Sequence, residues 1–177
     1  MRTTWRWPRD HDEGDLIVSE MDEVIPALVA AVQEQHATGD HYRDDAIRQA
    51  MEHQAQLSLR PGPVRVDVIV DPPWSDGQIN SVQVVTGDRP FLVDTVVSCL
   101  LRHGWRVEDV RHPIIGVKRD RGTIEAVGTP GRGGCASESW IHIDVTAPLG
   151  TDIGQAAEQL RDDLCACLDQ VVCATDD

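Results

Sequence analysis

The sequence lacks any run of the roughly 18 consecutive apolar residues that a membrane-spanning helix requires. Its first residues, 1–8, are followed at once by acidic residues from Asp10, which is unlike the pattern of a secretory signal peptide. These two absences predict a cytoplasmic protein that has no membrane partner.

Basic residues are also scarce. Lysine and arginine together number 16, whereas aspartate and glutamate number 30, and the formal net charge at pH 7 is −14. Proteins bind the phosphate backbone of nucleic acids through lysine and arginine contacts, and no basic stripe interleaved with aromatic residues offsets the negative charge here. We therefore expect no nucleic-acid partner.

The common motifs of catalytic and nucleotide-binding sites are missing. The sequence has no Gly-x-Ser-x-Gly, no His-Glu-x-x-His and no Gly-x-Gly-x-x-Gly. A glycine-rich loop at Thr129–Gly134 lacks the Gly-Lys-Ser/Thr ending of a phosphate-binding loop. We expect no catalytic residue and no bound cofactor in this chain.

Residues that commonly bind metals do not form a recognisable metal site. Cys165 and Cys167 are two residues apart, so on a helix their side chains point about 200° apart and cannot share one ion. His112 and His142 fall on predicted strands, and without a third ligand we interpret them as structural. An odd number of cysteines with no secretion signal predicts buried, reduced, inert thiols: Cys99, Cys135, Cys165, Cys167 and Cys173.

The N-terminal third of the chain has helical periodicity. Apolar residues spaced by three and four predict a first helix from about Asp22, and a thinner stripe predicts a second over about 44–56. The proline- and glycine-rich segment Arg60–Pro63 then marks a boundary. We expect residues 1–60 to form an N-terminal tail and helical segment, and residues 61–177 to form a separate domain.

Beyond this boundary the apolar period changes from helical to alternating. The uneven succession of strands and helices favours an α+β fold in which an antiparallel sheet carries helices on one face. The expected elements are strands at Val64–Val70 and Ile79–Thr86, a helix capped by Asp88 and stopped by Gly104, strands at Trp105–Lys118, Thr123–Val127 and Glu138–Val145, and a last helix from about Thr151 or Asp152.

The turn after the strand Ile79–Thr86 has the best chemistry for a ligand. The N-terminus of a helix presents unpaired N–H groups and partial positive charge, which suit a carboxylate. The acidic side chain of Asp88 suits an ammonium group, so the two together complement a free amino acid. The other interpretation is that Gly87 and Asp88 only form a turn and a cap, and the residues alone favour it.

Three motifs resemble a known family. The sequence Asp88-Arg89-Pro90-Phe91-Leu92 is similar to the Asp-x-Pro-Gly-x-Leu turn of ACT domains, which commonly bind amino acids there and pair through their sheets. More specifically, three segments resemble, in the same order, the first ACT segment of large bacterial NAD-specific glutamate dehydrogenases: Asp88–Val96, His112–Ile115 and Glu138–Ile143. The resemblance extends over about Val64–Val145.

The resemblance implies a ferredoxin-like ACT fold and a non-catalytic regulatory domain. The parent enzyme would oxidatively deaminate glutamate to 2-oxoglutarate, with NAD bound by catalytic domains for which this chain has no room. Implied partners are the remainder of that dehydrogenase or a self-associating copy, and a free amino acid as effector. The implied ligand-binding residues are Gly87, Asp88, Arg89, Pro90, Phe91 and Leu92.

Two alternatives to amino-acid sensing stay open. One is a ligand-free module for oligomerisation or assembly of the same enzyme, and a more distant one is a free-standing enzyme with an unrecognised site. Phe91 stands where the ACT pattern has glycine. An open pocket beside Phe91 would favour sensing, a filled one would favour assembly, and an independent enzyme would need a cleft with convergent titratable groups.

The sheet of an ACT domain also ends with a strand after the last helix. Only the short polar segment Ala174–Asp177 follows Cys173, which is not enough for such a strand. We predict that Val64–Val70 fills the vacant place beside Ile79–Thr86, or that this edge stays open for a partner.

Overall fold

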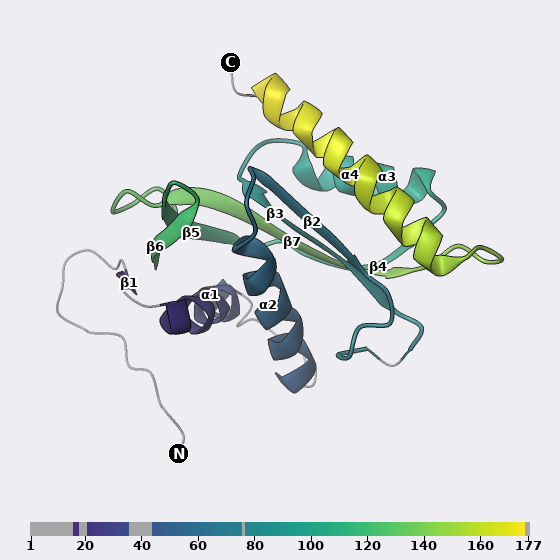
Figure 1. Cartoon of the computed structure of the whole chain (residues 1–177), viewed down its shortest axis with the longest axis horizontal. Coiled ribbons are helices and arrows are strands. Elements are labelled where there is room, and N and C mark those ends of the chain that lie inside the picture. Colours follow the sequence, from purple (N-terminus) through teal and green to yellow (C-terminus); the bar gives the residue numbers. More distant parts are fainter. Residues whose placement is uncertain (1–15, 18–20, 36–43, 76, 176–177) are drawn as a thin grey trace.

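The structure is a computed structural model, and it describes residues 16–17, 21–35, 44–75 and 77–175 (Figure 1). The predicted division into segments 1–60 and 61–177 stays a prediction. None of the described helices is long and apolar enough to cross a membrane.

The chain has an α+β architecture with one seven-stranded antiparallel sheet (Figure 1). The strands lie in the order β1-β6-β5-β7-β3-β2, and β4 also pairs with β7. The elements are β1 (Leu16–Ile17), α1 (Met21–Gln35), α2 (Asp44–Ser58), β2 (Val64–Ile69), β3 (Asn80–Gly87), α3 (Leu92–Arg102), β4 (Arg106–Arg111), β5 (Ile114–Asp120), β6 (Thr123–Gly128), β7 (Ala136–Thr146) and α4 (Ile153–Thr175).

The long strand β7 organises the sheet. On one side it pairs with β3 along its length, from Asn80 opposite Val145 to Gly87 opposite Glu138. On its other side it pairs with β5 through its first residues and with β4 through its last. The predicted single strand Trp105–Lys118 is therefore wrong. It is two strands, because Pro113 lies between them and proline has no N–H for a ladder.

The strand β2 lies beside β3, in register from Val64 opposite Thr86 to Ile69 opposite Ser81. The prediction that Val64–Val70 fills the place next to Ile79–Thr86 is confirmed. Valines alternate along both strands, so the pairing brings one apolar face of each strand to the same side of the sheet.

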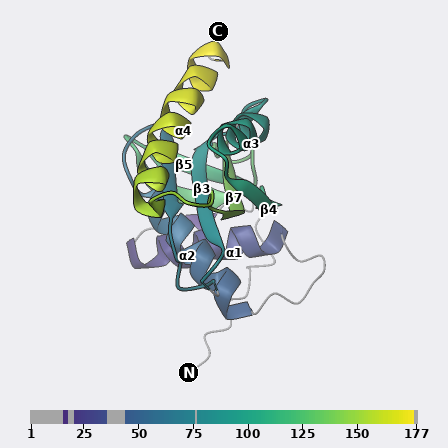
Figure 2. The same cartoon turned by 90° about the vertical axis from the view of Figure 1, so that its right-hand side faces the viewer.

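Helices cover both faces of the sheet (Figures 1 and 2): α3 and α4 lie on one face, and α1 and α2 on the other. The predicted single layer of helices is wrong for the chain as a whole. The reason is visible in β7, where Ile141 and Ile143 belong to the core under α3 and α4, while Trp140 belongs to the core under α1 and α2. A sheet that is apolar on both faces has to bury both.

Local hydrogen bonds fix where α3 ends and where α4 begins. Gly104 has a φ of 76° after α3, and the N–H of Trp105 donates to the carbonyl of Leu100, which closes the helix end. The predicted stop at Gly104 is confirmed. At the start of α4, the carboxylate of Asp152 accepts a hydrogen bond of 3.0 Å from the N–H of Gln155, as a helix cap does.

Candidate functional site

The predicted amino-acid-binding turn connects β3 to α3. The N–H of Asp88 donates to the carbonyl of Ser137 at 2.8 Å, and its carboxylate accepts a 2.6 Å hydrogen bond from the hydroxyl of Ser139. The helix begins at Leu92, and no side chain caps it. The prediction that Asp88 caps α3 is therefore wrong, because its carboxylate is held by β7 and lies four residues before the helix.

The other residues of the turn lie in different surroundings. Gly87 is the last residue of β3 and Pro90 is exposed, whereas Leu92 is buried in the core. The guanidinium of Arg89 donates a 3.1 Å hydrogen bond to the hydroxyl of Thr175, near the end of α4. The turn is thus anchored to the sheet through Asp88, to the core through Leu92 and to α4 through Arg89.

Phe91 occupies the glycine position of the ACT pattern in the conformation that favours glycine. Its φ is 70° and its ψ is 5°, in the left-handed region that costs residues with a side chain roughly 1–2 kcal/mol. The residue is 71% exposed, so its side chain does not fill the space beside the turn.

A histidine extends the hydrogen bonding of Asp88. The hydroxyl of Ser139 has a single hydrogen, which it donates to Asp88, so its oxygen accepts from Nε2–H of His112 at 3.0 Å. Burial lowers the pKa of His112, and the negative charge of Asp88 opposes this shift. Among the described residues no lysine or arginine forms an ion pair with the exposed Asp88, which lies beside the start of α3.

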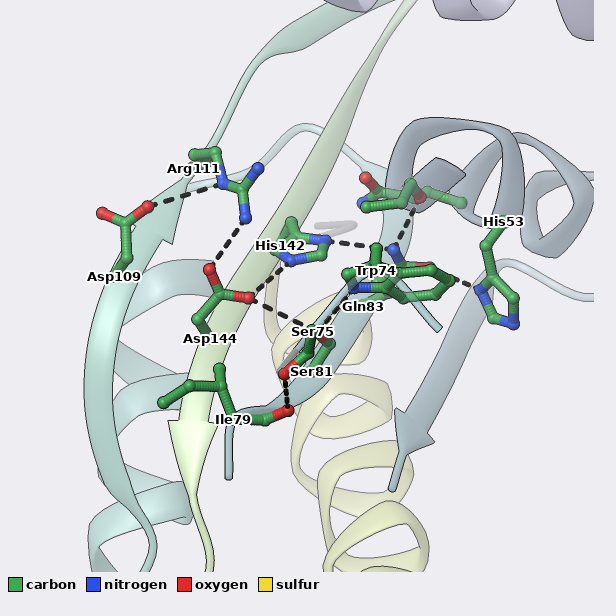
Figure 3. Close-up of polar contacts among 12 residues, drawn as sticks. His53, Trp74, Ser75, Ile79, Ser81, Gln83, Asp109, Arg111, His142 and Asp144 are labelled. Carbon is green, nitrogen blue, oxygen red and sulfur yellow. Dashed lines mark hydrogen bonds and ion pairs between the residues drawn. The ribbon is translucent and has the colours of Figure 1, made fainter. Parts of the chain in front are cut away.

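A second cluster, which we call the polar chain, lies on the face of the sheet that α2 covers (Figure 3). It runs from His53 of α2 through Gln83 of β3 to His142 and Asp144 of β7, and ends at Arg111 of β4. Four contacts of 2.8–3.0 Å link these five residues in order. Asp144 and His142 lie on the same face of β7 as Trp140, because alternate residues of a strand point to the same side of the sheet.

The hydrogens of the polar chain follow from the amide of Gln83. Its two N–H groups are used by the carbonyl of Ala50, at 2.8 Å, and by Nδ1 of His142. Nδ1 of His142 is therefore an acceptor, and Nε2–H donates to Asp144. The side-chain oxygen of Gln83 accepts from Nδ1–H of His53.

Electrostatics support this assignment. Burial lowers the pKa of His142, which is therefore neutral at pH 7. Burial acts to raise the pKa of Asp144, but the hydrogen bond from His142 and the charge of Arg111 outweigh it, so the net shift is downward. These contacts fit the predicted structural role of His142. His142 and His112 do not contact each other, because each is hydrogen-bonded to partners of its own.

A cavity of about 260 Å³ opens beside the polar chain. Its walls are α2, the β2–β3 connection with Trp74, and the charged residues Glu108, Asp109, Arg111 and Asp144. Arg111 already lies 2.9 Å from Asp144 and 3.5 Å from Asp109, so the carboxylates of this wall outnumber its cation. The cavity has the size of a small metabolite and the charge to receive an ammonium group.

Sequence reasoning missed the polar chain because its members come from four separate elements. The available signal was weak: alternate polar residues in β7 and the lone glutamine within the valine-rich strand β3. Among the residues that the structure describes, no group of three or more histidine, cysteine or acidic side chains is arranged to hold a metal ion.

The family model of the glutamate dehydrogenase ACT1 domain matches residues 27–164. The chain belongs to this family. The match to an ACT1 domain confirms the family that the three motifs resembled, and it indicates a regulatory domain of a glutamate dehydrogenase. No solved structure shows significant similarity to the chain.

The matched range of the ACT1 domain starts within α1 and ends within α4. It therefore includes the turn Gly87–Leu92, the polar chain and the whole of the sheet except β1.

Proposed function

We propose that this ACT1 domain is a non-catalytic domain that senses a free amino acid for an NAD-dependent glutamate dehydrogenase. That enzyme would oxidatively deaminate glutamate to 2-oxoglutarate, with NAD held by its catalytic domains. The partner of this chain would be the rest of the dehydrogenase, and the effector would bind at the turn Gly87–Leu92.

The strand order supports an ACT-type, ferredoxin-like arrangement for the central part of the chain. The strands β2, β3, β7 and β4–β5 lie side by side, and α3 and α4 cover one face. In this arrangement β2 takes the place of the strand that would otherwise follow the last helix, so the order is permuted but the layers are kept.

One observation carries the sensing proposal: the exposed carboxylate of Asp88 lies beside a helix start that no side chain caps. The first N–H groups of α3 can donate to the carboxylate of a ligand, and Asp88 can accept from its ammonium group. Phe91 is turned outward and leaves this surface accessible.

The test is calorimetric titration of the chain with each of the common amino acids. Asp88→Asn keeps an oxygen acceptor for Ser139 but removes the charge. Because a hydrogen bond to a charged group contributes about 1.5–3 kcal/mol, this variant should bind the effector roughly 10- to 100-fold more weakly. Glu158→Gln removes one charge from an exposed position near the start of α4 and serves as the matched control.

Two outcomes would contradict the proposed site. If Asp88→Asn binds as tightly as the parent while Asp109→Asn does not, the effector lies in the cavity beside the polar chain. If no amino acid binds at all, the assembly module becomes the better proposal. That alternative is favoured by one observation: β2 ends the sheet, and within the described part of the chain no strand pairs with its outer edge. The mass of the protein in solution tests it directly.

A further inference from the structure

Two cysteines from different helices share one neighbour. Cys99 lies on α3 and Cys167 on α4, and the guanidinium of Arg102 reaches both. Its Nη2 atom is 3.6 Å from the sulfur of Cys99 and 3.4 Å from that of Cys167. The two sulfurs are therefore separated by at most about 7 Å, the sum of these distances.

We propose that Cys99 and Cys167 form a redox site, which a hydroperoxide oxidises to a disulfide that links α3 to α4. The predicted burial of all five thiols is wrong for Cys165 and Cys167, which are half-buried, and for Cys173, which is exposed.

The surroundings of the two thiols give them different roles. Cys167 is accessible in part and lies beside a guanidinium, as reactive cysteines commonly do. Cys99 is 2% exposed, and burial first, then the charge of Cys167, raises its pKa. A hydroperoxide thus reaches Cys167 first, and Cys99 is the thiol that resolves the product.

The reaction balances with the peroxide as the only oxidant. The thiol of Cys167 releases its proton, the thiolate attacks one peroxide oxygen, and the O–O bond breaks; the proton goes to the leaving oxygen, so the products are a sulfenic acid and water or an alcohol. The sulfur of Cys99 then attacks the sulfur of Cys167. The S–S bond forms, the S–O bond breaks, and the hydroxyl leaves as water with the proton of Cys99. Two electrons pass from the two thiols to the peroxide.

Closing the bond requires only local movement. A disulfide has an S–S distance of about 2.05 Å, so the two side chains must turn toward one another. Arg102, the residue that touches both sulfurs, is exposed and can swing into solvent. The α3 and α4 helices are already joined near this point by a 2.7 Å contact between His103 and Asp163, which keeps the two cysteines opposite each other.

The test uses the full chain at low concentration, treated with hydrogen peroxide and then with an alkylating agent. Intact mass should show the loss of two hydrogen atoms and two fewer alkylated thiols. Peptide mapping without reductant should identify a Cys99–Cys167 link, and the melting temperature should rise until a reductant is added. Cys173→Ser is the matched control and should still form the link.

Cys167→Ser should abolish the link, and because this residue is partly exposed the variant should stay folded, as near-ultraviolet circular dichroism can check. Cys99→Ser should also abolish it and trap the sulfenic acid on Cys167. The proposal is overturned if the oxidised chain carries a different disulfide, or if Cys167 is oxidised to sulfinic acid without any link to Cys99.

Discussion

Replacing Gln83 with leucine tests whether the polar chain holds α2 on the sheet. Gln83 is 0% exposed and comes from the middle of β3. Its amide donates to the carbonyl of Ala50 in α2 and to Nδ1 of His142 in β7. Leucine has a similar volume, so the substitution removes hydrogen bonds without opening a large cavity.

The expected cost follows from the groups that lose their partner. Nδ1 of His142 is buried and loses its donor, and an unsatisfied buried group costs about 1–3 kcal/mol, whereas the carbonyl of Ala50 lies inside α2 and keeps its helical hydrogen bond. His53, the third partner of Gln83, is partly exposed and can bind water instead, so the loss of its hydrogen bond adds little to the cost. Gln83→Leu should therefore reduce the free energy of unfolding by about 1–3 kcal/mol.

Urea denaturation at pH 7, followed by circular dichroism, measures this loss. Gln49→Leu is the control, because Gln49 is exposed on α2 and its replacement should change stability by less than about 0.5 kcal/mol. A folded Gln83→Leu variant that loses less than about 1 kcal/mol, with the same dependence on urea, would show that water or other groups replace the amide and that the polar chain does not position α2.

Three further predictions concern single residues. Because burial lowers the pKa of His142 below 6.5, the unfolded state takes up the proton first as pH falls. The stability that the neutral ring provides above pH 6.5 should thus be lost as pH falls below 6.5, by up to about 1.4 kcal/mol per pH unit. His142→Gln should reduce this dependence of stability on pH, measured by urea denaturation between pH 5 and 7. An unchanged dependence would show that other groups cause it. Phe91→Gly should be more stable than Phe91→Ala by about 0.5–1 kcal/mol, because both variants lose the ring but only glycine adopts this positive φ without strain. Equal melting temperatures for the two variants would argue against backbone strain at residue 91. Gly116→Ala should reduce the free energy of unfolding by at least about 2 kcal/mol, because the added Cβ would collide with the backbone of Gly128. In Gly87→Ala the added Cβ meets only the side chain of Arg89, so this variant should lose little stability. Similar melting temperatures for the two variants would contradict the close approach of β5 and β6.

Local patterns predicted much of the secondary structure. The alternation of valines placed β2 and β3, and the predicted pairing of these two strands is confirmed. The stop at Gly104 followed from the need for a left-handed residue after α3. The three ordered motifs resembled the family whose model matches residues 27–164.

The partners of individual side chains were not predictable in this way. Asp88 has the sequence position of a helix cap, yet its carboxylate binds Ser139, which is 51 residues away. Cys167 was judged against its helix neighbour Cys165, whereas its neighbour in space is Cys99.

The sequence by itself therefore determined which segments form strands, which form helices and where turns interrupt them, because these features depend on neighbours within a few positions. Only the tertiary structure decided that both faces of the sheet are covered, and that Gln83 joins α2 to β7. The physical reason is that a buried polar group needs a partner but any compatible group can supply it, and the folded chain selects that group by bringing distant segments together.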